Sequence, residues 1–284
     1  MDIDVLGGLM VRVNGVSVTP TAPKPRQVLA LLALHADRVV PVPVLFEEVW
    51  AGRPPRSART TLQTYVLQLR ELIAAALGTD EQHDGGRLGA KDILMTTPGG
   101  YLLSPGGGTS DVREFERLAG TGYRAMDAGD FAGAARQLRE ALDLWSESAF
   151  ADVQAGPQLR MEAKRLEESR LCALDQRIEA DLRLGRHREL LAELTVLVNQ
   201  YRTHESLHAQ FMLALQRSGR RGEALDVYQR LRGTLVHEAG LEPSAGLRRL
   251  QRSMLAAAAE PLAPPTASAT GTGPERERAA GIGW

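Results

Sequence analysis

The segment from Ser57 to Leu77 reads SARTTLQTYVLQLRELIAAAL, and it decides how the rest of the chain is interpreted. Its apolar residues recur at steps of three and four, which predicts a helix with one apolar face: Leu62, Val66, Leu69, Ile73 and Leu77. The other face would carry hydroxyl, amide and guanidinium groups: Arg59, Thr60, Gln63, Thr64 and Gln68. A helix that enters a DNA groove needs such a polar, non-acidic front, but an ordinary amphipathic surface helix has the same pattern. The flanking sequence distinguishes between the two.

The sequence before this helix predicts a small antiparallel sheet and a buried helix. Asn14-Gly15 lies between alternating apolar segments and is a strong hairpin signal. Three short strands are therefore expected near residues 2–6, 10–13 and 16–19. The helix from Pro25 to Leu34 is apolar nearly all round, and proline suits its first position because the missing N–H has no helical partner there.

The remaining elements predicted in the first hundred residues complete the order of strands and helices found in a winged helix. Residues 39–41 are interpreted as a linker, and residues 43–50 predict a second helix with three inward side chains: Leu45, Val49 and Trp50. A polar loop at 78–89 precedes two short strands at 93–97 and 101–103. A hairpin sheet, three helices and a terminal hairpin are winged-helix architecture, in which the third helix enters the major groove and the wing touches the backbone or minor groove.

Composition favours a helical protein whose first part is locally basic. The 284 residues leave room for about two domains. Hydrophobic residues make up 43% and aromatic residues only 5%, which favours helices over sandwiches. The net charge of −1 gives no global attraction to a polyanion. Between Lys24 and Arg70, however, seven lysines and arginines accompany three acids, so the region of the third helix carries a positive excess.

Composition also limits the compartment and the chemistry. The single Cys172 excludes an internal disulfide and is expected to be a small buried hydrophobe. The start lacks a signal peptide, and the longest apolar run, Val28–Leu34, is too short to span a bilayer, so we expect a cytoplasmic protein with no membrane partner. His204 and His208 have the spacing of metal ligands, but no third ligand stands beside them, and we expect a solvated or helix-capping pair. We predict no metal, no cofactor and no enzyme activity.

The second part of the chain predicts paired helices. After a glycine-rich boundary at 104–109, Ser110 or Asp111 would cap the first helix. Later helices turn at polar junctions that contain glycine: Gly129, Gly185 and Gly219. No such pair buries its apolar face alone, so the pairs must stack, and the pattern resembles degenerate tetratricopeptide repeats. Beyond Ala259, proline, glycine and charge predominate, and we expect a disordered tail.

Four segments of the first part resemble one known family. They are KPRQVLALLAL (24–34), VWAGRPP (49–55), TLQTYV (61–66) and TPGGYL (97–102). All are similar to the Streptomyces antibiotic regulatory protein (SARP) family, which comprises activators of secondary-metabolite gene clusters. GLEPSAGLRRL (240–250) resembles the closing phrase of that family's bacterial transcriptional activator domain.

The resemblance implies a fold and a domain plan. The fold would be mainly α with a small antiparallel β component. Residues 1–105 would form an OmpR-type winged-helix domain, and residues 110–257 an all-α, tetratricopeptide-like activator domain. Residues 260–284 would be the tail. With no phosphate-loop motif, the chain resembles the small members of the family.

In this plan, base edges give specificity and phosphates give affinity. We expect bases to be read by the front of the third helix: Arg59, Thr60, Thr61, Gln63, Thr64 and Gln68. Phosphate or wing contacts are expected from a second set: Lys24, Arg26, Arg53, Arg56, Arg70, Lys91, Thr96, Thr97 and Tyr101. OmpR-type wings often present an arginine near the tip, where this chain has Thr97. That departure weakens the expectation of minor-groove entry, and Lys91 is the basic residue placed to compensate.

The implied function is sequence-specific transcriptional activation. By resemblance, the first domain would bind tandem repeats in double-stranded promoter DNA, with head-to-tail self-association on the DNA. The second would recruit RNA polymerase holoenzyme to antibiotic biosynthesis genes. The alternative is a helical-repeat adaptor or sensor whose winged helix binds protein. The near-neutral total charge favours the alternative, whereas the clustered basic residues and the polar helix front argue against it.

Overall fold

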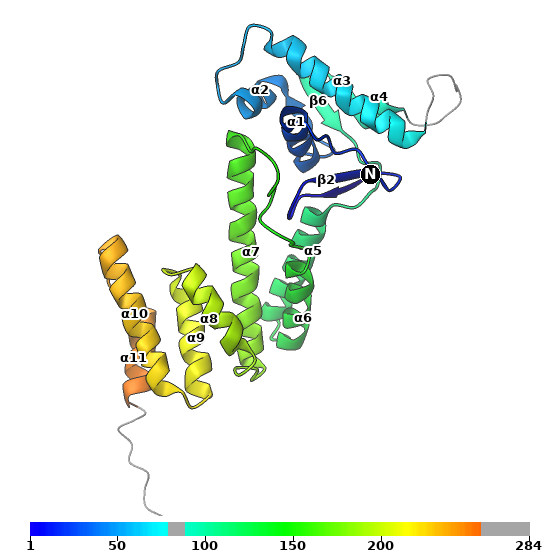
Figure 1. The fold of residues 1–284 in the computed structure, drawn as a ribbon. Coiled ribbons are helices and arrows are strands. Elements are labelled where there is room, and N and C mark those ends of the chain that lie inside the picture. The colour runs from blue at the N-terminus through cyan, green and yellow to red at the C-terminus, as the bar shows by residue number, and fades with distance from the viewer. Residues whose placement is uncertain (79–88, 257–284) are drawn as a thin grey trace, which may run out of the picture.

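The computed structural model describes residues 1–78 and 89–256, and it is mainly helical with two small antiparallel sheets. In Figure 1 the strands and the first helices form one end of an elongated molecule, and the later helices extend away from it. This confirms the predicted fold class, a winged-helix region followed by a helical-repeat region. The predicted tail at 260–284 and most of the predicted loop at 78–89 lie outside the described residues.

The N-terminal sheet forms as the hairpin signal predicts. It contains β1 (Asp2–Asp4), β2 (Met10–Val13) and β3 (Val16–Ser17), in that order. Between β2 and β3, Asn14 and Gly15 have φ of 51° and 80°. Both values are positive, which is why this turn uses asparagine followed by glycine.

The second sheet includes a strand that the sequence did not indicate. Residues 39–41 were expected to be a linker, but they form β4 (Val39–Pro41). It pairs with β6 (Gly100–Leu103), which also pairs with β5 (Leu94–Thr97). A Cβ at Gly100 would lie 2.3 Å from the carbonyl oxygen of Val40, so the close approach of β4 to β6 requires glycine. Pro41 is tolerated because β4 is an edge strand.

Four helices complete the winged-helix part: α1 (Pro23–Leu34), α2 (Val42–Trp50), α3 (Ala58–Leu77) and the short, unpredicted α4 (Ala90–Ile93). Helix α1 is buried from Val28 to Ala33, as its apolar sequence requires. Helix α3 buries Leu62, Val66, Leu69 and Ile73 and packs mainly on α1, α4 and β2. Its predicted apolar face is therefore confirmed.

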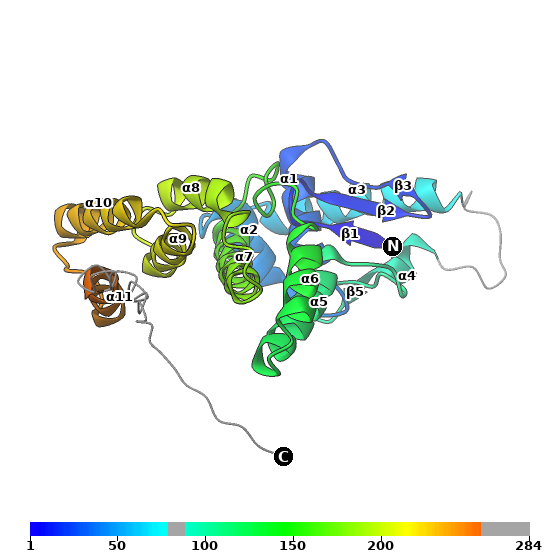
Figure 2. The ribbon, with the colours of Figure 1, turned by 90° about the horizontal axis from the view of Figure 1, so that it is seen from below.

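Seven helices follow: α5 (Asp111–Asp127), α6 (Phe131–Leu142), α7 (Pro157–Arg183), α8 (Leu190–Gln200), α9 (Glu205–Arg217), α10 (Arg221–Ala239) and α11 (Ala245–Ala256). The predicted cap is present, because Ser110 Oγ accepts from the N–H of Arg113. Helix α6 packs between α5 and α7, and helix α9 packs on α7, α8 and α10, as the view in Figure 2 shows. Gly122 of α5 faces Leu138 of α6 so closely that an added Cβ would lie 2.5 Å from it.

The hydrophobic core continues across the boundary predicted at 104–109. One cluster of buried residues runs from Ile3 of β1 to Ala173 of α7, and a second runs from Ile178 to Met254. Helix α7 thus takes part in both cores. The winged helix and α5–α7 form one packed body, so the winged-helix part is not a structurally independent unit.

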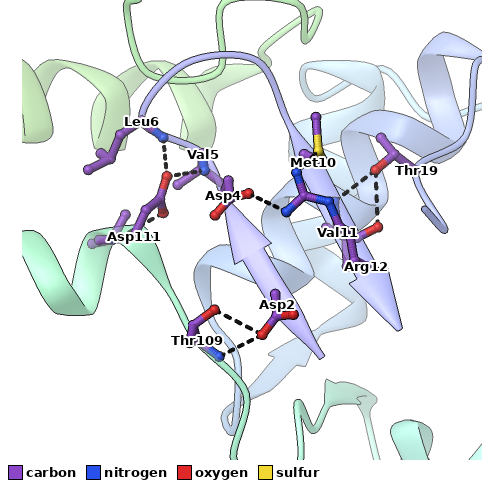
Figure 3. Close-up of polar contacts among 11 residues, drawn as sticks. Asp2, Asp4, Val5, Leu6, Met10, Val11, Arg12, Thr19, Thr109 and Asp111 are labelled. Carbon is purple, nitrogen blue, oxygen red and sulfur yellow. Dashed lines mark hydrogen bonds and ion pairs between the residues drawn. The ribbon is translucent and has the colours of Figure 1, made fainter. Parts of the chain in front are cut away.

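Two carboxylates, Asp111 of α5 and Asp2 of β1, join the N-terminal sheet to α5 and to the loop before it (Figure 3). Asp111 Oδ2 accepts from the backbone N–H groups of Val5 at 2.6 Å and Leu6 at 2.7 Å. Burial raises the pKa of the Asp111 carboxyl above its ordinary value, while these N–H donors act in the opposite direction. Asp2 accepts from both the backbone N–H and the hydroxyl of Thr109.

Glu48 joins the winged helix to α7. Its side chain is 1% exposed and accepts from three backbone N–H groups at the start of α7, those of Gly156, Gln158 and Leu159. Gln27 of α1 donates to the same carboxylate and to the Glu48 carbonyl. A carboxylate at a helix N-terminus satisfies N–H groups that have no helical partner. A Cβ at Gly156 would lie 2.0 Å from the Glu48 carbonyl oxygen, so only glycine fits here.

Two further predictions concerned the burial of Cys172 and the absence of a membrane-spanning helix. Cys172 was expected to be buried, but the residue is exposed on α7, so that prediction is wrong. The helical pattern correctly placed Cys172 in a helix, but it did not show that the residue lies on the exposed side of that helix. Across the described ranges, none of the helices combines the length and the apolar character that a membrane span requires.

Candidate nucleic-acid interface

The outward face of α3 is polar and open. Arg59, Thr60, Gln63, Thr64 and Gln68 are all exposed, as predicted. Thr61 is only half-buried, and its hydroxyl donates to the carbonyl of Ser57 at 3.0 Å. Helix α3 lies on the outside of the winged-helix part (Figure 1) and packs on α1, α4 and β2, so these exposed side chains face solvent.

Thr64 presents its methyl group more readily than its hydroxyl. Its Oγ1 donates to the carbonyl of Thr60 at 3.1 Å, one turn earlier in α3. This bond occupies the hydroxyl hydrogen and leaves the methyl group and the oxygen lone pairs for a ligand. The amides of Gln63 and Gln68 have no hydrogen-bond partner among the described residues.

Three arginines border the N-terminal end of α3. Arg53 and Arg56 lie in the loop between α2 and α3, and Arg59 lies in the first turn of α3. All three are exposed, and none has an ion pair or a side-chain hydrogen bond within residues 1–78 and 89–256. Ala51 and Gly52, with φ of 50° and 80°, end α2 and turn the chain into this loop. The result is a cationic rim next to a neutral hydrogen-bonding face.

Lys24 and Arg26 have partners inside the protein. Lys24 Nζ donates to the carbonyl of Val49 at 2.7 Å, near the end of α2, where unpaired carbonyls favour a cation. Arg26 donates to the carbonyls of Pro20 and Leu9 and forms an ion pair with Asp152. The structure places both cations in contacts that hold the fold together.

Arg70 also has internal partners, although the sequence suggested a phosphate contact. Its Nε and Nη2 donate to the carbonyl of Leu94 at 2.9 and 2.7 Å, and Nη2 donates to Thr96 Oγ1 at 2.8 Å. Leu94 and Thr96 belong to β5. The guanidinium therefore fastens the wing to α3.

The wing is the β5–β6 hairpin, with Pro98-Gly99 at its turn. Tyr101 was expected on its surface but is 7% exposed, because it pairs with both Val40 and Thr96 and packs into the core. Thr97 is half-buried, whereas Thr96 is exposed. Lys91 is exposed on α4, away from the turn.

Sequence reasoning missed two residues on the α3 front. Leu67 is 55% exposed, and Glu71 is exposed one turn further along. Residues three, four and seven positions apart share a helical face, which places Leu67 with Thr60, Gln63 and Thr64. The signal was present in the sequence, since Leu67 does not fit the steps of the buried face.

His204 and His208 make different local contacts at the start of α9. His204 precedes α9, where its Nδ1 accepts from the N–H of Leu207, which is the predicted capping role. His208 is buried, and its Nδ1 lies 3.0 Å from the carbonyl oxygen of His204. The part of the chain that the structure describes contains no group of three metal-binding side chains.

Comparison with known families matches both halves of the molecule. Residues 17–83 match the family described as "Transcriptional regulatory protein, C terminal", and residues 110–255 match "Bacterial transcriptional activator domain". A solved structure of Mycobacterium tuberculosis EmbR, in complex with a low affinity phosphopeptide, has the same fold. It gives a TM-score of 0.80 at 32% identity and covers 92% of this chain and 66% of that one.

Sequence relatives are named as regulators. The chain is 53% identical over 257 residues to Regulatory protein DnrI of Streptomyces peucetius, which covers 90% of this chain and 93% of DnrI. It is 35% identical over 254 residues to Regulatory protein AfsR of Streptomyces coelicolor, but spans only 24% of AfsR. With an OmpR-type region, an activator domain and this similarity to DnrI, the chain belongs to the SARP family of transcriptional activators and is of the small type.

Proposed function

We propose that this protein activates transcription by binding promoter DNA with the exposed face of α3. The observation that carries the proposal is an open polar helix face next to three exposed arginines at its N-terminal end, none of which has a side-chain partner among the described residues. A winged helix places such a face in the major groove, where each base pair presents a distinct pattern of donors and acceptors.

The side chains divide into two roles. Arg53, Arg56 and Arg59 meet phosphates beside the groove, because they are exposed and have no side-chain partner in residues 1–78 and 89–256. Gln63 and Gln68 read base edges, since an amide bonds adenine in two places. Thr60 and Thr64 contribute shorter contacts on the same face. Lys24, Arg26, Arg70 and Tyr101 support the fold and are not assigned to DNA.

The wing contributes to positioning. Its exposed groups near the turn are Thr96 and the backbone at Pro98-Gly99, and Lys91 is the nearest predicted cation on α4. Without an arginine at the tip, the wing meets the sugar–phosphate backbone and does not insert deeply into the minor groove.

The helical half serves activation. Family membership supports binding to tandem repeats, with protomers arranged head to tail, and recruitment of RNA polymerase holoenzyme to antibiotic biosynthesis genes. Because one core joins the winged helix to α5–α7, DNA binding would fix the direction in which α8–α11 project (Figure 1). A rigid connection of this kind is suited to presenting a surface to polymerase at a set distance from the operator.

The test begins with selection of duplexes from a random DNA library by the full-length protein. A repeated, enriched motif bound with salt-sensitive affinity is expected. Failure to enrich any motif would overturn the DNA-binding proposal and favour a protein-binding role for the winged helix. In a second stage, transcription with purified RNA polymerase holoenzyme from a promoter carrying the motif should rise on adding the protein. Binding without this rise would overturn the activation step alone.

A further inference from the structure

Leu67 is an apolar residue among the polar side chains of the proposed DNA-binding surface. Its side chain is 55% exposed, while Leu62, Val66 and Leu69 of the same helix are at most 2% exposed. It follows Thr64 by three residues and Gln63 by four, so the three side chains lie on adjacent turns of one face. The fold thus leaves more than half of a large aliphatic side chain exposed on the proposed interface.

The charges around this face limit what can cover Leu67. Arg53, Arg56 and Arg59 lie toward the N-terminal end, and all are exposed and unpartnered among the described residues. Glu71 is exposed one turn beyond Leu67. A polyanion would therefore be held at the N-terminal side and repelled beyond Leu67, which places Leu67 near the limit of the contact.

DNA offers one apolar group in its major groove. The C5-methyl of thymine projects there, and no other standard base carries a methyl group at that edge. Aliphatic side chains recognise it by contact, whereas amides and guanidinium groups recognise hydrogen-bonding edges. Burying Leu67 against thymine would remove apolar surface of both groups from water.

We infer that Leu67 is a specificity-determining residue that contacts a thymine methyl group within the operator. The inference rests on the proposed DNA-binding function and adds a base class to it. Leu67 selects thymine at one position, and the glutamines beside it read hydrogen-bonding edges at neighbouring positions.

The experiment removes the thymine methyl group and the leucine side chain separately and together. Binding of the full-length protein is measured by fluorescence anisotropy on the duplex obtained by selection, with each thymine replaced singly by deoxyuridine. For the unaltered protein, one replacement should weaken binding about fourfold, as expected for one buried methyl group. For Leu67→Ala the same replacement should have no effect, because the contact is already lost. Leu67→Met, which keeps an aliphatic side chain, should retain most of the penalty.

Two control variants separate the possible outcomes. Gln68→Ala should bind more weakly but keep the deoxyuridine penalty, and Val236→Ala, 47% exposed on α10, should behave like the unaltered protein. Equal penalties for the unaltered protein and Leu67→Ala at every thymine, or no penalty for either, would overturn the inference while leaving DNA binding intact. Absence of any selected motif would instead overturn the proposed function. Thermal unfolding of each variant verifies that the exposed substitution leaves the fold unchanged.

Discussion

Arg56 and Arg70 carry the same charge, but their surroundings differ. Arg56 is exposed with no partner among the described residues, whereas Arg70 makes three hydrogen bonds to β5. Residue type and helical spacing predicted the open face of α3 correctly. They could not separate the free arginines from Lys24, Arg26 and Arg70, because the carbonyls that bind these three come from remote segments brought close by folding.

Arg56→Ala tests the role of the free arginines. Loss of one phosphate contact should weaken binding to all DNA sequences and make the slope of log K against log salt shallower by about 0.9. The measurement is a titration at several salt concentrations. Arg249→Ala, an exposed cation on α11, removes equal charge far from α3 and should leave the slope unchanged. If Arg56→Ala and Arg249→Ala give the same salt slope, Arg56 does not contact a phosphate.

His208 makes stability depend on pH. Burial lowers the pKa of its imidazole below the ordinary value of 6.5, although the nearby His204 carbonyl acts in the opposite direction. As the pH falls below 6.5, the unfolded chain binds a proton at His208 before the folded chain does, so the free energy of unfolding falls over that interval.

Chemical denaturation of the unaltered protein and His208→Gln at pH 7.5 and 5.5 checks this. The variant should lose less stability than the unaltered protein over that interval. His35, whose pKa burial also lowers, contributes in the same direction and remains in both proteins. An equal loss in the two proteins would show that His208 is not responsible.

At the scale of elements, those with a local sequence signal were predictable, whereas strand β4 and helix α4 were not. The apolar spacing of α3 gave its buried face, and the Asn14-Gly15 signal gave the β2–β3 hairpin. Strand β4 has three residues, and its pairing partner Tyr101 lies about sixty positions away, so no local pattern reveals it. The same pairing explains why Tyr101 is buried and is not on the surface of the wing.

The attachment of the wing to α3 depends on Arg70. Arg70→Met keeps much of the side-chain volume but leaves the Leu94 carbonyl and Thr96 hydroxyl without their donor, which should cost roughly 2 kcal/mol of stability. DNA binding should weaken for all sequences, with an unchanged salt slope. Arg59→Met is the matched control. It should also lower the affinity for DNA, but it should make the salt slope shallower and leave the stability unchanged. A shallower salt slope for Arg70→Met would show that Arg70 contacts a DNA phosphate and would contradict its assignment to the fold alone.

At the scale of the molecule, one core joins the winged helix to α5–α7. The sequence indicated a boundary at 104–109 from composition alone, because glycine and proline mark a turn but say nothing about which surfaces meet. The buried bonds from Glu48 to the start of α7 span more than 100 residues of sequence. Such a contact depends on the packed structure and is not visible in any local motif.

Glu48→Ala should therefore weaken the whole assembly. It leaves three backbone N–H groups without their acceptor in a buried site and removes one of the two Gln27 bonds to Glu48, at a cost of roughly 3 kcal/mol. The neighbouring Glu47→Ala removes an exposed contact to Gln158 and should change stability little. Denaturant unfolding measures both variants. Similar stabilities would show that the Glu48 contacts do not hold the two halves together.

Site-directed DNA cleavage tests the central claim, that the exposed face of α3 lies against the operator, most directly. In a Cys172→Ser background, an iron chelate is attached to a cysteine replacing Gln63, and in a second protein to one replacing Val236, an exposed residue of α10. We predict cleavage of the selected duplex within the operator from position 63 and no site-specific cleavage from position 236. Cleavage from position 236 but not from position 63, by proteins that still bind the duplex, would contradict the account.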